Sequence, residues 1–200
     1  MKKIPSLFIR EFEGHNIKNI INQVTPGCEW VIQGEGIATE KYDGTCCLIQ
    51  NNKLYKRYDA KQGKQPPEGA IPCQPEPDPI TTHWPHWVEV KENKPDDKWY
   101  IEAWKRLQET SERYNRIIED GTYELCGPHF QTNPYDLEFD LFYKHGDKVL
   151  ENVPRTFEGI KNYLENNYIE GIVFYRGNSE MCKIKRTDFG LEWNGKRSKR

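Results

Sequence analysis

A proline-rich stretch between residues 62 and 85 limits most strongly what this chain can fold into. Seven of the chain's 13 prolines lie in it. Proline fixes φ and lacks a backbone N–H, so neither a helix nor a central strand can run through such a stretch. We therefore predict a long irregular loop at about 62–85. Its end, from Thr82 to Val88, is aromatic and is expected to pack on the body of the protein.

On the N-terminal side of this loop, the spacing of apolar residues predicts mainly strands. Ile17, Ile20, Ile21 and Val24 instead recur at helical spacing, with Pro26-Gly27 after them. We expect a strand at 5–13, a helix at 16–24, a strand at 37–41, and a hairpin of strands 46–50 and 54–58 joined by Asn51-Asn52.

On its C-terminal side, the pattern predicts a long helix followed by strands with one helix inserted. We expect a helix capped by Asp96 or Asp97 and ending near Glu119, strands at 122–126, 137–143, 171–175 and 181–185, and a helix at 156–168. The fold class is α+β, with mostly antiparallel sheets flanked by helices. Two hundred residues without a clear break predict a single domain over 1–200.

The composition excludes some classes of protein. A net charge of -2 rules out binding to nucleic acid by bulk positive charge, although local basic groups remain at 53–64, at 183–186 and in a solvated tail at 196–200. No apolar run approaches the roughly 18 residues of a membrane span, and no signal-type segment begins the chain. We expect a cytoplasmic (intracellular) protein that does not bind membranes.

The six cysteines predict neither a zinc site nor a disulfide framework. They lie at 28, 46, 47, 73, 126 and 182, and no pair has Cys-x-x-Cys spacing. Because Cys46 and Cys47 are adjacent, their side chains point to opposite faces of a strand. Buried reduced thiols are the expected state.

A lysine in a short motif, Lys41-Tyr42-Asp43-Gly44, points to covalent chemistry. Only about 1 in 2,500 lysine amines is neutral at pH 7. A lysine that attacks phosphorus therefore needs cationic neighbours or a metal to lower its pKa. Taken alone, the motif is typical of an exposed turn, so the rest of the chain has to supply those neighbours.

Several further motifs follow the lysine in a fixed order. Each has an ordinary structural explanation when it is taken alone: paired lysines on a strand are usually solvated, and a glutamate at a strand end often lies at the surface. In chain order they are Arg57, Glu124-x-x-Gly127, Phe139-Asp140, Glu170-Gly171 and Lys183-x-Lys185.

This ordered series resembles the covalent nucleotidyltransferase superfamily of ATP-dependent DNA and RNA ligases and mRNA capping enzymes. The resemblance spans residues 30 to 190. Within the superfamily the chain is most similar to small stand-alone RNA ligases of the animal 5′→3′ type. The sequence segments that support this similarity are Glu40-Lys41-Tyr42-Asp43-Gly44-Thr45-Cys46-Cys47, Arg57-Tyr58-Asp59-Ala60-Lys61, Asn133-Pro134-Tyr135 and Cys182-Lys183-Ile184-Lys185.

The resemblance implies a fold and a reaction. The fold is a nucleotidyltransferase (ATP-grasp-like ligase) adenylation domain, and we expect no OB-fold domain because the chain ends about 15 residues after Lys185. In the reaction, Lys41 attacks ATP to form lysyl-AMP. AMP then passes to an RNA 5′-phosphate, and a 3′-hydroxyl attacks the activated phosphate to seal the strand. The implied partners are ATP and RNA with 5′-phosphate and 3′-hydroxyl ends, and no obligate protein partner is inferred.

The resemblance also assigns roles to the motif residues. The catalytic set is Lys41, Lys183, Lys185 and Asp43, in which the two later lysines bind the α-phosphate and lower the pKa of Lys41. Glu170 holds Mg²⁺, or Mn²⁺ as a substitute, directly or through water. The nucleotide-binding set is Glu40, Lys41, Arg57, Glu124, Phe139, Glu170, Lys183 and Lys185. Within that set Glu124 binds the ribose, Arg57 the ribose or RNA phosphate, and Phe139 stacks on adenine, with Phe142 as the alternative.

Other functions remain open at this stage. A GTP-dependent capping-type nucleotidyltransferase and a DNA ligase share the lysine chemistry. A noncatalytic nucleotide- or RNA-binding protein shares only the fold. His83, His86 and His129 are expected to pack or to stack on RNA rather than to bind metal, and Trp84 and Trp87 are candidates for stacking on unpaired bases.

Overall fold

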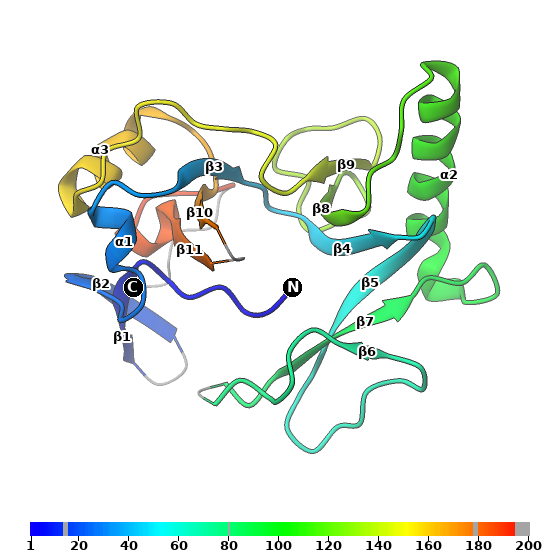
Figure 1. Ribbon diagram of the computed structural model, residues 1–200, viewed down its shortest axis with the longest axis horizontal. Coiled ribbons are helices and arrows are strands. Elements are labelled where there is room, and N and C mark those ends of the chain that lie inside the picture. The colour runs from blue at the N-terminus through cyan, green and yellow to red at the C-terminus, as the bar shows by residue number, and fades with distance from the viewer. Residues whose placement is uncertain (14–15, 80, 178–179, 195–200) are drawn as a thin grey trace. The chain divides into compact units, whose positions relative to one another are not determined.

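The computed structural model describes residues 1–13, 16–79, 81–177 and 180–194 (Figure 1), so the basic tail at 196–200 lies outside the described residues. Contacts divide the chain into two compact units. Unit 1 consists of Met1–Lys3 and Asp43–His145, and unit 2 of Ile4–Tyr42 and Gly146–Arg200. The α+β class with antiparallel sheets is confirmed. The assignment of residues 1–200 to a single nucleotidyltransferase domain stays a prediction.

Unit 1 is built on a six-stranded antiparallel sheet. Its spatial order is β6-β7-β5-β4-β8-β9. The strands are β4 (Thr45–Gln50), β5 (Lys53–Ala60), β6 (Ile71–Pro72), β7 (Trp84–Glu89), β8 (Gly121–Cys126) and β9 (Leu141–Lys144). The long helix α2 (Lys98–Arg113) follows the short 3-10 turn η1 (Pro95–Asp97), and in Figure 1 it stands as the long green helix of this unit.

The two faces of this sheet differ because side chains alternate along each strand. One face packs on α2: Cys47, Ile49, Tyr123 and Leu125 form a buried cluster with Trp104 of the helix. The intervening residues of the same strands point to the opposite face. That face carries Cys46, Arg57 and Glu124, so the polar motif residues of unit 1 share one side of the sheet.

The predicted hairpin is confirmed as β4 and β5. Asn51 and Asn52 both have positive φ, at 51° and 57°. This is the backbone of a type I′ turn, which asparagine adopts more readily than most residues and whose twist matches that of the strands it joins. The turn fixes the register, with Cys47 opposite Lys56.

The proline-rich segment is irregular over most of its length, as predicted, but contains the two-residue strand β6 and ends in β7. Pro85 is the second residue of β7, a place near a strand start where its missing N–H is tolerated. The aromatic end packs on the body, since His86 and Trp87 are buried. Because Trp87 is buried, the expectation that it stacks on an RNA base is wrong.

Helix α2 begins where the sequence indicates but is not capped as expected. Asp97 occupies the N-cap position without a side-chain capping bond. Its fully buried carboxylate instead pairs with Lys56 and accepts a hydrogen bond from the backbone N–H of Lys91. The helix ends at Arg113, several residues before Glu119.

Unit 2 contains a three-stranded antiparallel sheet, a separate hairpin and short helices. The sheet order is β11-β10-β3. Its elements are β1 (Phe8–Glu13), β2 (Asn16–Val24), α1 (Glu29–Ile32), β3 (Ile37–Lys41), α3 (Phe157–Asn166), β10 (Gly171–Arg176), β11 (Glu180–Lys185) and the 3-10 turn η2 (Arg186–Phe189). The buried core includes Leu7, Ile160, Leu164 and Phe174, which join the hairpin, α3 and the sheet.

The prediction of a helix at 16–24 is wrong, because this segment is strand β2. Phe8 of β1 pairs with Val24, and Arg10 pairs with Ile20. β-Branched isoleucine and valine favour extended backbone, and the asparagines of the segment are poor helix formers. The pairing with β1 satisfies the backbone hydrogen-bonding groups of the segment. This tertiary contact outweighs the helical preference that the spacing indicates.

The last predicted strand of unit 1 is shorter than expected. It was predicted at 137–143 and is β9, which begins at Leu141. Phe139 therefore lies outside the strand, with 42% of its surface exposed. The guanidinium of Arg106 lies 3.9 Å from the centre of its ring.

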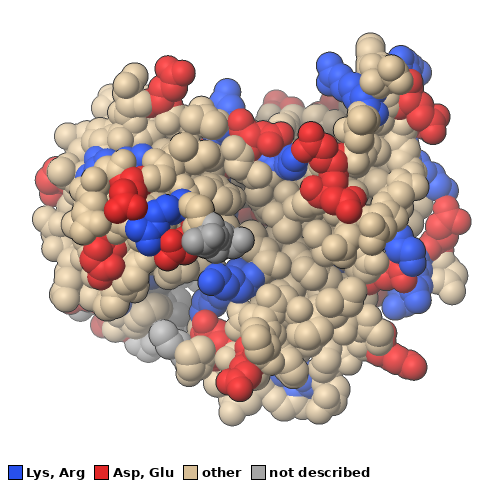
Figure 2. Space-filling model, in the orientation of Figure 1, with Lys and Arg blue, Asp and Glu red and all other residues tan. Residues whose placement is uncertain are grey.

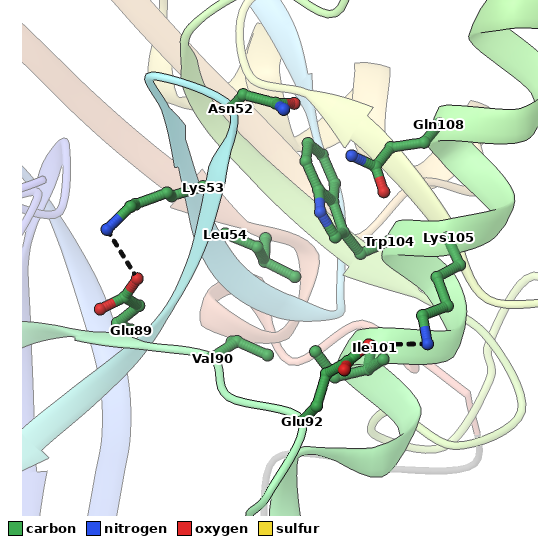
Figure 3. A pocket seen from close by; sticks show the side chains of 10 residues that line it. All are labelled: Asn52, Lys53, Leu54, Glu89, Val90, Glu92, Ile101, Trp104, Lys105 and Gln108. Atoms are coloured by element: carbon green, nitrogen blue, oxygen red, sulfur yellow. Dashed lines mark ion pairs between the residues drawn. The ribbon is translucent and has the colours of Figure 1, made fainter.

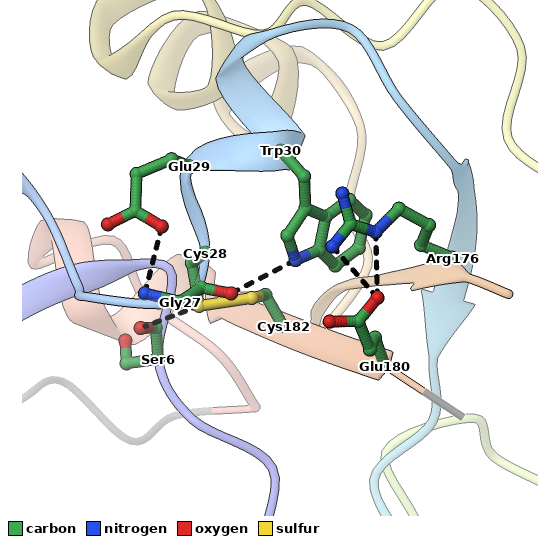
Figure 4. The surroundings of a disulfide bond; sticks show 8 residues. All are labelled: Ser6, Gly27, Cys28, Glu29, Trp30, Arg176, Glu180 and Cys182. Carbon is green, nitrogen blue, oxygen red and sulfur yellow. Dashed lines mark hydrogen bonds and ion pairs between the residues drawn. A yellow bond between two sulfur atoms is a disulfide. The ribbon is translucent and has the colours of Figure 1, made fainter. Parts of the chain in front are cut away.

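A disulfide joins Cys28 to Cys182, so the expectation of reduced thiols only is wrong (Figure 4). Cys28 precedes α1 and Cys182 lies in β11, and both are buried. A pairing across 154 residues cannot be recognised from cysteine spacing, because only the folded unit brings the two together. Cys46, Cys47, Cys73 and Cys126 are free, as expected.

The described helices include none that is both long enough and apolar enough to cross a lipid bilayer.

Candidate functional site

Three lysines of unit 2 gather around one buried glutamate because of strand register. Gly171, at the start of the central strand β10, lies opposite Lys185 on one side and Lys41 on the other. Glu170 directly precedes it and therefore reaches both neighbouring strands. A side chain at Gly171 is excluded, since a Cβ there would lie 2.2 Å from the carbonyl oxygen of Ile184.

Glu170 pairs with two of these lysines at once. Its Oε2 lies 2.6 Å from Lys41 Nζ, and its Oε1 lies 2.7 Å from Lys185 Nζ. Only 3% of the Glu170 side chain is exposed, against 18% for Lys41 and 33% for Lys185. Lys41 Nζ also donates to the carbonyl oxygen of Tyr42 at 3.1 Å. The buried Glu170 carboxylate thus binds two ammonium groups at the end of the sheet where β10 begins.

Lys183 is the third lysine and has no carboxylate partner among the described residues. It shares a face of β11 with Lys185, as predicted from their spacing. Burial, together with the charges of Lys41, Lys185 and Arg10, lowers the pKa of Lys183 to about 8, although Glu170 opposes the shift.

Arg10 adds a fourth cation that the sequence motifs did not indicate. It lies on β1 and pairs with Asp188 of η2 at 2.8 Å. Asp188 also accepts a hydrogen bond from the backbone N–H of Lys185. The guanidinium is near enough to Lys183 to lower its pKa. No sequence motif indicates Arg10, because it reaches the cluster through pairing of the segment before β1 with β11, where Leu7 N donates to the carbonyl oxygen of Lys183.

Glu40 is not part of the lysine cluster. It precedes Lys41 on β3, so its side chain points to the opposite face. Burial raises the pKa of its carboxyl group, and the charge of Lys148 opposes the shift. Its nucleotide-binding role stays a prediction.

Asp43 lies beyond the end of β3, which ends at Lys41. Asp43 belongs to unit 1, where its backbone N–H donates to Tyr135 Oη at 2.7 Å. Its catalytic role also stays a prediction.

Glycine at position 44 is explained by packing within unit 1. A Cβ there would lie 2.3 Å from the carbonyl oxygen of Leu125 and 2.6 Å from Cys126 Sγ. The close approach that the motif requires is thus to strand β8. Because β8 also carries Glu124, this contact brings the backbone of the motif next to that carboxylate.

Glu124 is buried on the polar face of the unit 1 sheet and is held through both oxygens. Oε1 accepts a hydrogen bond from Gly44 N at 3.1 Å, and Oε2 lies 2.9 Å from His145 Nε2. His145 Nδ1 in turn lies 3.0 Å from Thr122 Oγ1. His145 was missed in the sequence, because it follows β9 without any motif and meets Glu124 only through strand pairing.

Cys46 completes a group of three donor atoms with Glu124 and His145, all within 4.8 Å of one another. A cysteine binds a metal ion as the thiolate. Burial, followed by the charge of Glu124, raises the pKa of Cys46 to about 12, and Arg57 supplies a neighbouring positive charge. Within this group Glu124 and His145 are bonded to each other, and we assign the group no metal.

The remaining predicted residues of unit 1 are placed separately. Arg57 lies on the polar face, pairs with Asp59 at 2.9 Å and donates to the carbonyl oxygen of Met1 at 3.0 Å. Phe139, half-exposed beneath Arg106, and Phe142, packed in the α2 cluster, are alternatives for adenine, and only Phe139 offers an exposed ring.

A pocket of about 260 Å³ lies on the α2 side of the sheet and is separate from the polar face (Figure 3). Leu54 and Trp104 line its interior. Two ion pairs among its lining residues, Lys53–Glu89 and Lys105–Glu92, leave no net charge there. It has neither of the motif carboxylates, and we assign it no role in the site.

The charged side chains on the face drawn in Figure 2 do not form one broad patch of a single sign. Figure 2 shows basic and acidic side chains interspersed on the face drawn, with wide uncharged areas between them. In the predicted basic stretch 53–64, Lys53, Lys56 and Arg57 each pair with a carboxylate. Positive charge is concentrated instead at the three lysines near Glu170.

Comparison with known proteins gives one consistent result. No family model matches the chain. Curated proteins named RNA ligase 1 from Rattus norvegicus and Pongo abelii are 26% identical to it, and the one from Mus musculus is 25% identical. Each match covers 78% of this chain and 68% of the relative. The chain is a distant relative of RNA ligase 1. The relationship predicted from the ordered motifs is thereby confirmed at the level of an RNA ligase-like protein.

Proposed function

We propose that this protein is an ATP-dependent RNA ligase that joins 5′-phosphate and 3′-hydroxyl RNA ends through lysyl-AMP and RNA-adenylate intermediates. The observation that carries the proposal is the pairing of Lys41 and Lys185 with the buried Glu170, with Lys183 beside them. The distant relatives named RNA ligase 1 support the same reaction class.

The lysine cluster suits a phosphate-bearing substrate. Lys41, Lys183, Lys185 and Arg10 provide four cations, and Glu170 and Asp188 provide two anions. The excess positive charge would be neutralised by the phosphates of ATP. Phosphoryl transfer depends mostly on positioning and charge neutralisation, which fixed ammonium groups supply without reorganisation.

In the first step, Lys41 Nζ forms a bond to the α-phosphorus while the bond to pyrophosphate breaks. The amine must first lose a proton. Glu170 Oε2, 2.6 Å away, is the acceptor that the geometry offers. Lys183 and Lys185 then stabilise the charge on the α-phosphate and the departing pyrophosphate.

The polar face of unit 1 would hold the nucleoside. Glu124 accepts hydrogen bonds from the ribose hydroxyls, and Arg57 contacts the ribose or the RNA phosphate. Phe139 would have to turn away from Arg106 of α2 to stack on adenine.

Magnesium, or manganese in its place, would supply charge neutralisation on the phosphates. Glu170 is the carboxylate expected to hold it, but both of its oxygens are paired with lysines. A cation that arrived alone would meet three ammonium groups. Glu170 would hold the ion, directly or through water, if a lysine released one of its oxygens to bind phosphate instead.

The later steps transfer AMP to an RNA 5′-phosphate and then seal the strand. A phosphate–phosphate bond to AMP forms as the lysine–phosphorus bond breaks, and Lys41 regains its proton. The RNA 3′-hydroxyl next attacks the activated 5′-phosphate, and AMP leaves.

The test of the proposal has two parts. Incubation with α-labelled ATP or GTP, followed by denaturing electrophoresis, should show label retained from ATP. With ATP and Mg²⁺, a 5′-phosphate, 3′-hydroxyl RNA should be joined more efficiently than a matched DNA. Label from GTP alone, or sealing of DNA without sealing of RNA, would overturn the proposal.

A further inference from the structure

His145 is tied closely to the strand that carries Glu124. Its backbone N–H donates to the carbonyl oxygen of Thr122 at 3.0 Å, and its Nδ1 lies 3.0 Å from the hydroxyl of the same residue. Its Nε2 lies 2.9 Å from Glu124 Oε2. Both His145 and Glu124 are largely buried, with 15% and 12% of their side chains exposed. The imidazole therefore has little freedom to move.

The carboxylate of a glutamate rotates readily, because its last torsion has a broad profile. At Glu124 that rotation is restricted from both sides, by Gly44 N on Oε1 and by His145 on Oε2. Each carboxylate oxygen accepts two hydrogen bonds, so each keeps one open position. Two open positions on neighbouring oxygens match the two adjacent hydroxyls of a ribose.

We propose that His145 is a positioning residue that fixes the plane of Glu124 for contact with the ribose hydroxyls, and that it thereby determines the preference for ribonucleotides over deoxynucleotides. The proposal rests on the function proposed above and adds a residue to it. The role differs from that of Gly44, whose backbone N–H is present whatever the side chain. His145 is the side chain whose removal would release one oxygen of Glu124.

The same unit supplies a matched control. His129 Nδ1 lies 2.7 Å from Asp140 Oδ2, so it is a second imidazole–carboxylate pair. It stacks on Trp99 at 3.4 Å between ring centres. Asp140 is buried and its other oxygen is 3.2 Å from the backbone N of His129, an arrangement that holds a turn. Loss of this pair should affect folding without affecting ribose recognition.

The experiment compares His145→Leu, His145→Gln and His129→Leu. Affinities for ATP, 2′-deoxy-ATP and 3′-deoxy-ATP are measured by calorimetry in a Lys41→Ala background, where no covalent product forms. In parallel, KM and the rate of adenylation are measured with Lys41 intact. Leucine removes both side-chain hydrogen bonds, whereas glutamine returns an amide N–H near the position of Nε2.

His145→Leu should weaken ATP binding and raise its KM by about tenfold, as expected for a lost hydrogen bond to a charged group. The rate of adenylation at saturating ATP should change much less. Discrimination between ATP and the deoxy analogues should fall by a similar factor. His145→Gln should recover part of the preference, and His129→Leu should keep all of it.

The outcomes separate this proposal from the function on which it rests. Normal labelling of the parent protein with unchanged discrimination in a folded His145→Leu variant would overturn the role of His145 alone. If His145→Leu loses discrimination and the parent protein binds ATP but never becomes labelled, the role of His145 is supported and the ligase chemistry is rejected. Failure of the parent to bind ATP would overturn both. If His145→Leu does not fold, the ratio of affinities for ATP and its deoxy analogues is compared between His145→Gln and a folded His145→Asn variant. Equal ratios in these two variants decide against the proposal.

Discussion

Two buried glutamates, Glu170 in unit 2 and Glu124 in unit 1, have similar exposure but opposite surroundings. Glu170 holds two lysine ammonium groups, whereas Glu124 is held by a backbone N–H and an imidazole. Around Glu170, cations exceed anions, so an incoming ligand is expected to bring negative charge. Around Glu124, the carboxylate itself remains the acceptor. The same residue type is thus suited to a phosphate site in one unit and to a hydroxyl site in the other.

The largest expected effect concerns the nucleophile in the Glu170 cluster. Lys41→Ala should reduce covalent AMP labelling by at least about 1,000-fold, because no other group is expected to replace the attacking amine. Lys41→Arg is the matched control: it keeps a cation for Glu170 but lacks a comparable nucleophile, so it should fold normally and also fail to label. Label that persists in Lys41→Ala and maps by mass spectrometry to Lys183 would reassign the nucleophile.

The disulfide should stabilise the unit with the lysines and not the unit with Glu124. Cys28→Ser opens a link between residues 154 apart, and a long closed loop of this kind is expected to contribute about 2–5 kcal/mol. Urea unfolding with and without a reducing agent measures the effect. Cys73→Ser, at a free cysteine, should leave stability nearly unchanged. Equal unfolding of the Cys28→Ser variant and the parent would contradict the expectation.

Replacing each glutamate by glutamine tests the difference directly. Glu170→Gln leaves two lysines without their counter-charge and should lower the free energy of unfolding by about 2–3 kcal/mol. Glu124→Gln keeps a carbonyl oxygen for Gly44 N and should cost about 1 kcal/mol. Chemical denaturation at pH 7 measures both. A larger loss for Glu124→Gln would reverse the comparison.

The smallest expected effect is a gain in stability at Lys183. Its folded-state pKa is about 8, against 10.5 for an ordinary lysine, so between these values the unfolded chain binds more protons than the folded one. The charged side chain costs stability below pH 8, and the cost disappears as the pH rises toward 10.5. Lys183→Met should therefore stabilise the protein at pH 7 by on the order of 1–3 kcal/mol while impairing adenylation.

Urea unfolding at pH 7 and pH 10 measures this gain, which should shrink at the higher pH. Lys185→Met is the control, because Lys185 has Glu170 as a partner and its loss should destabilise. A Lys183→Met variant that is less stable than the parent at pH 7 would contradict the assignment.

Local patterns predicted much of the fold. Strands β3, β4, β10 and β11 lie where apolar residues and turn residues indicate, and helix α3 lies within the predicted range 156–168. The segment that became β2 was mistaken for a helix because its apolar residues recur at helical spacing, whereas its pairing with β1 decides the structure. The disulfide could not be predicted for the same reason, because the sequence around either cysteine does not indicate its partner.

The lysine set could be predicted because its residues occur in a fixed order along the chain. The structure brings Lys41, Glu170 and Lys185 into contact, as the order indicated. Arg10 and His145 could not be predicted, because they approach their clusters only through pairing between distant strands. The assigned roles in binding ATP, metal and RNA stay predictions.

The boundary between Tyr42 and Asp43 has a consequence for synthesis on the ribosome. Unit 1 is almost continuous in sequence, whereas the lysine cluster needs Arg10, Lys41, Glu170 and Lys185. At 5–20 residues per second, roughly 7 to 29 seconds separate the emergence of Lys41 from that of Lys185. Until then Lys41 is an ordinary solvated amine. A nascent chain can complete the glutamate–imidazole pair early, but its capacity for adenylation arises only with the last strand.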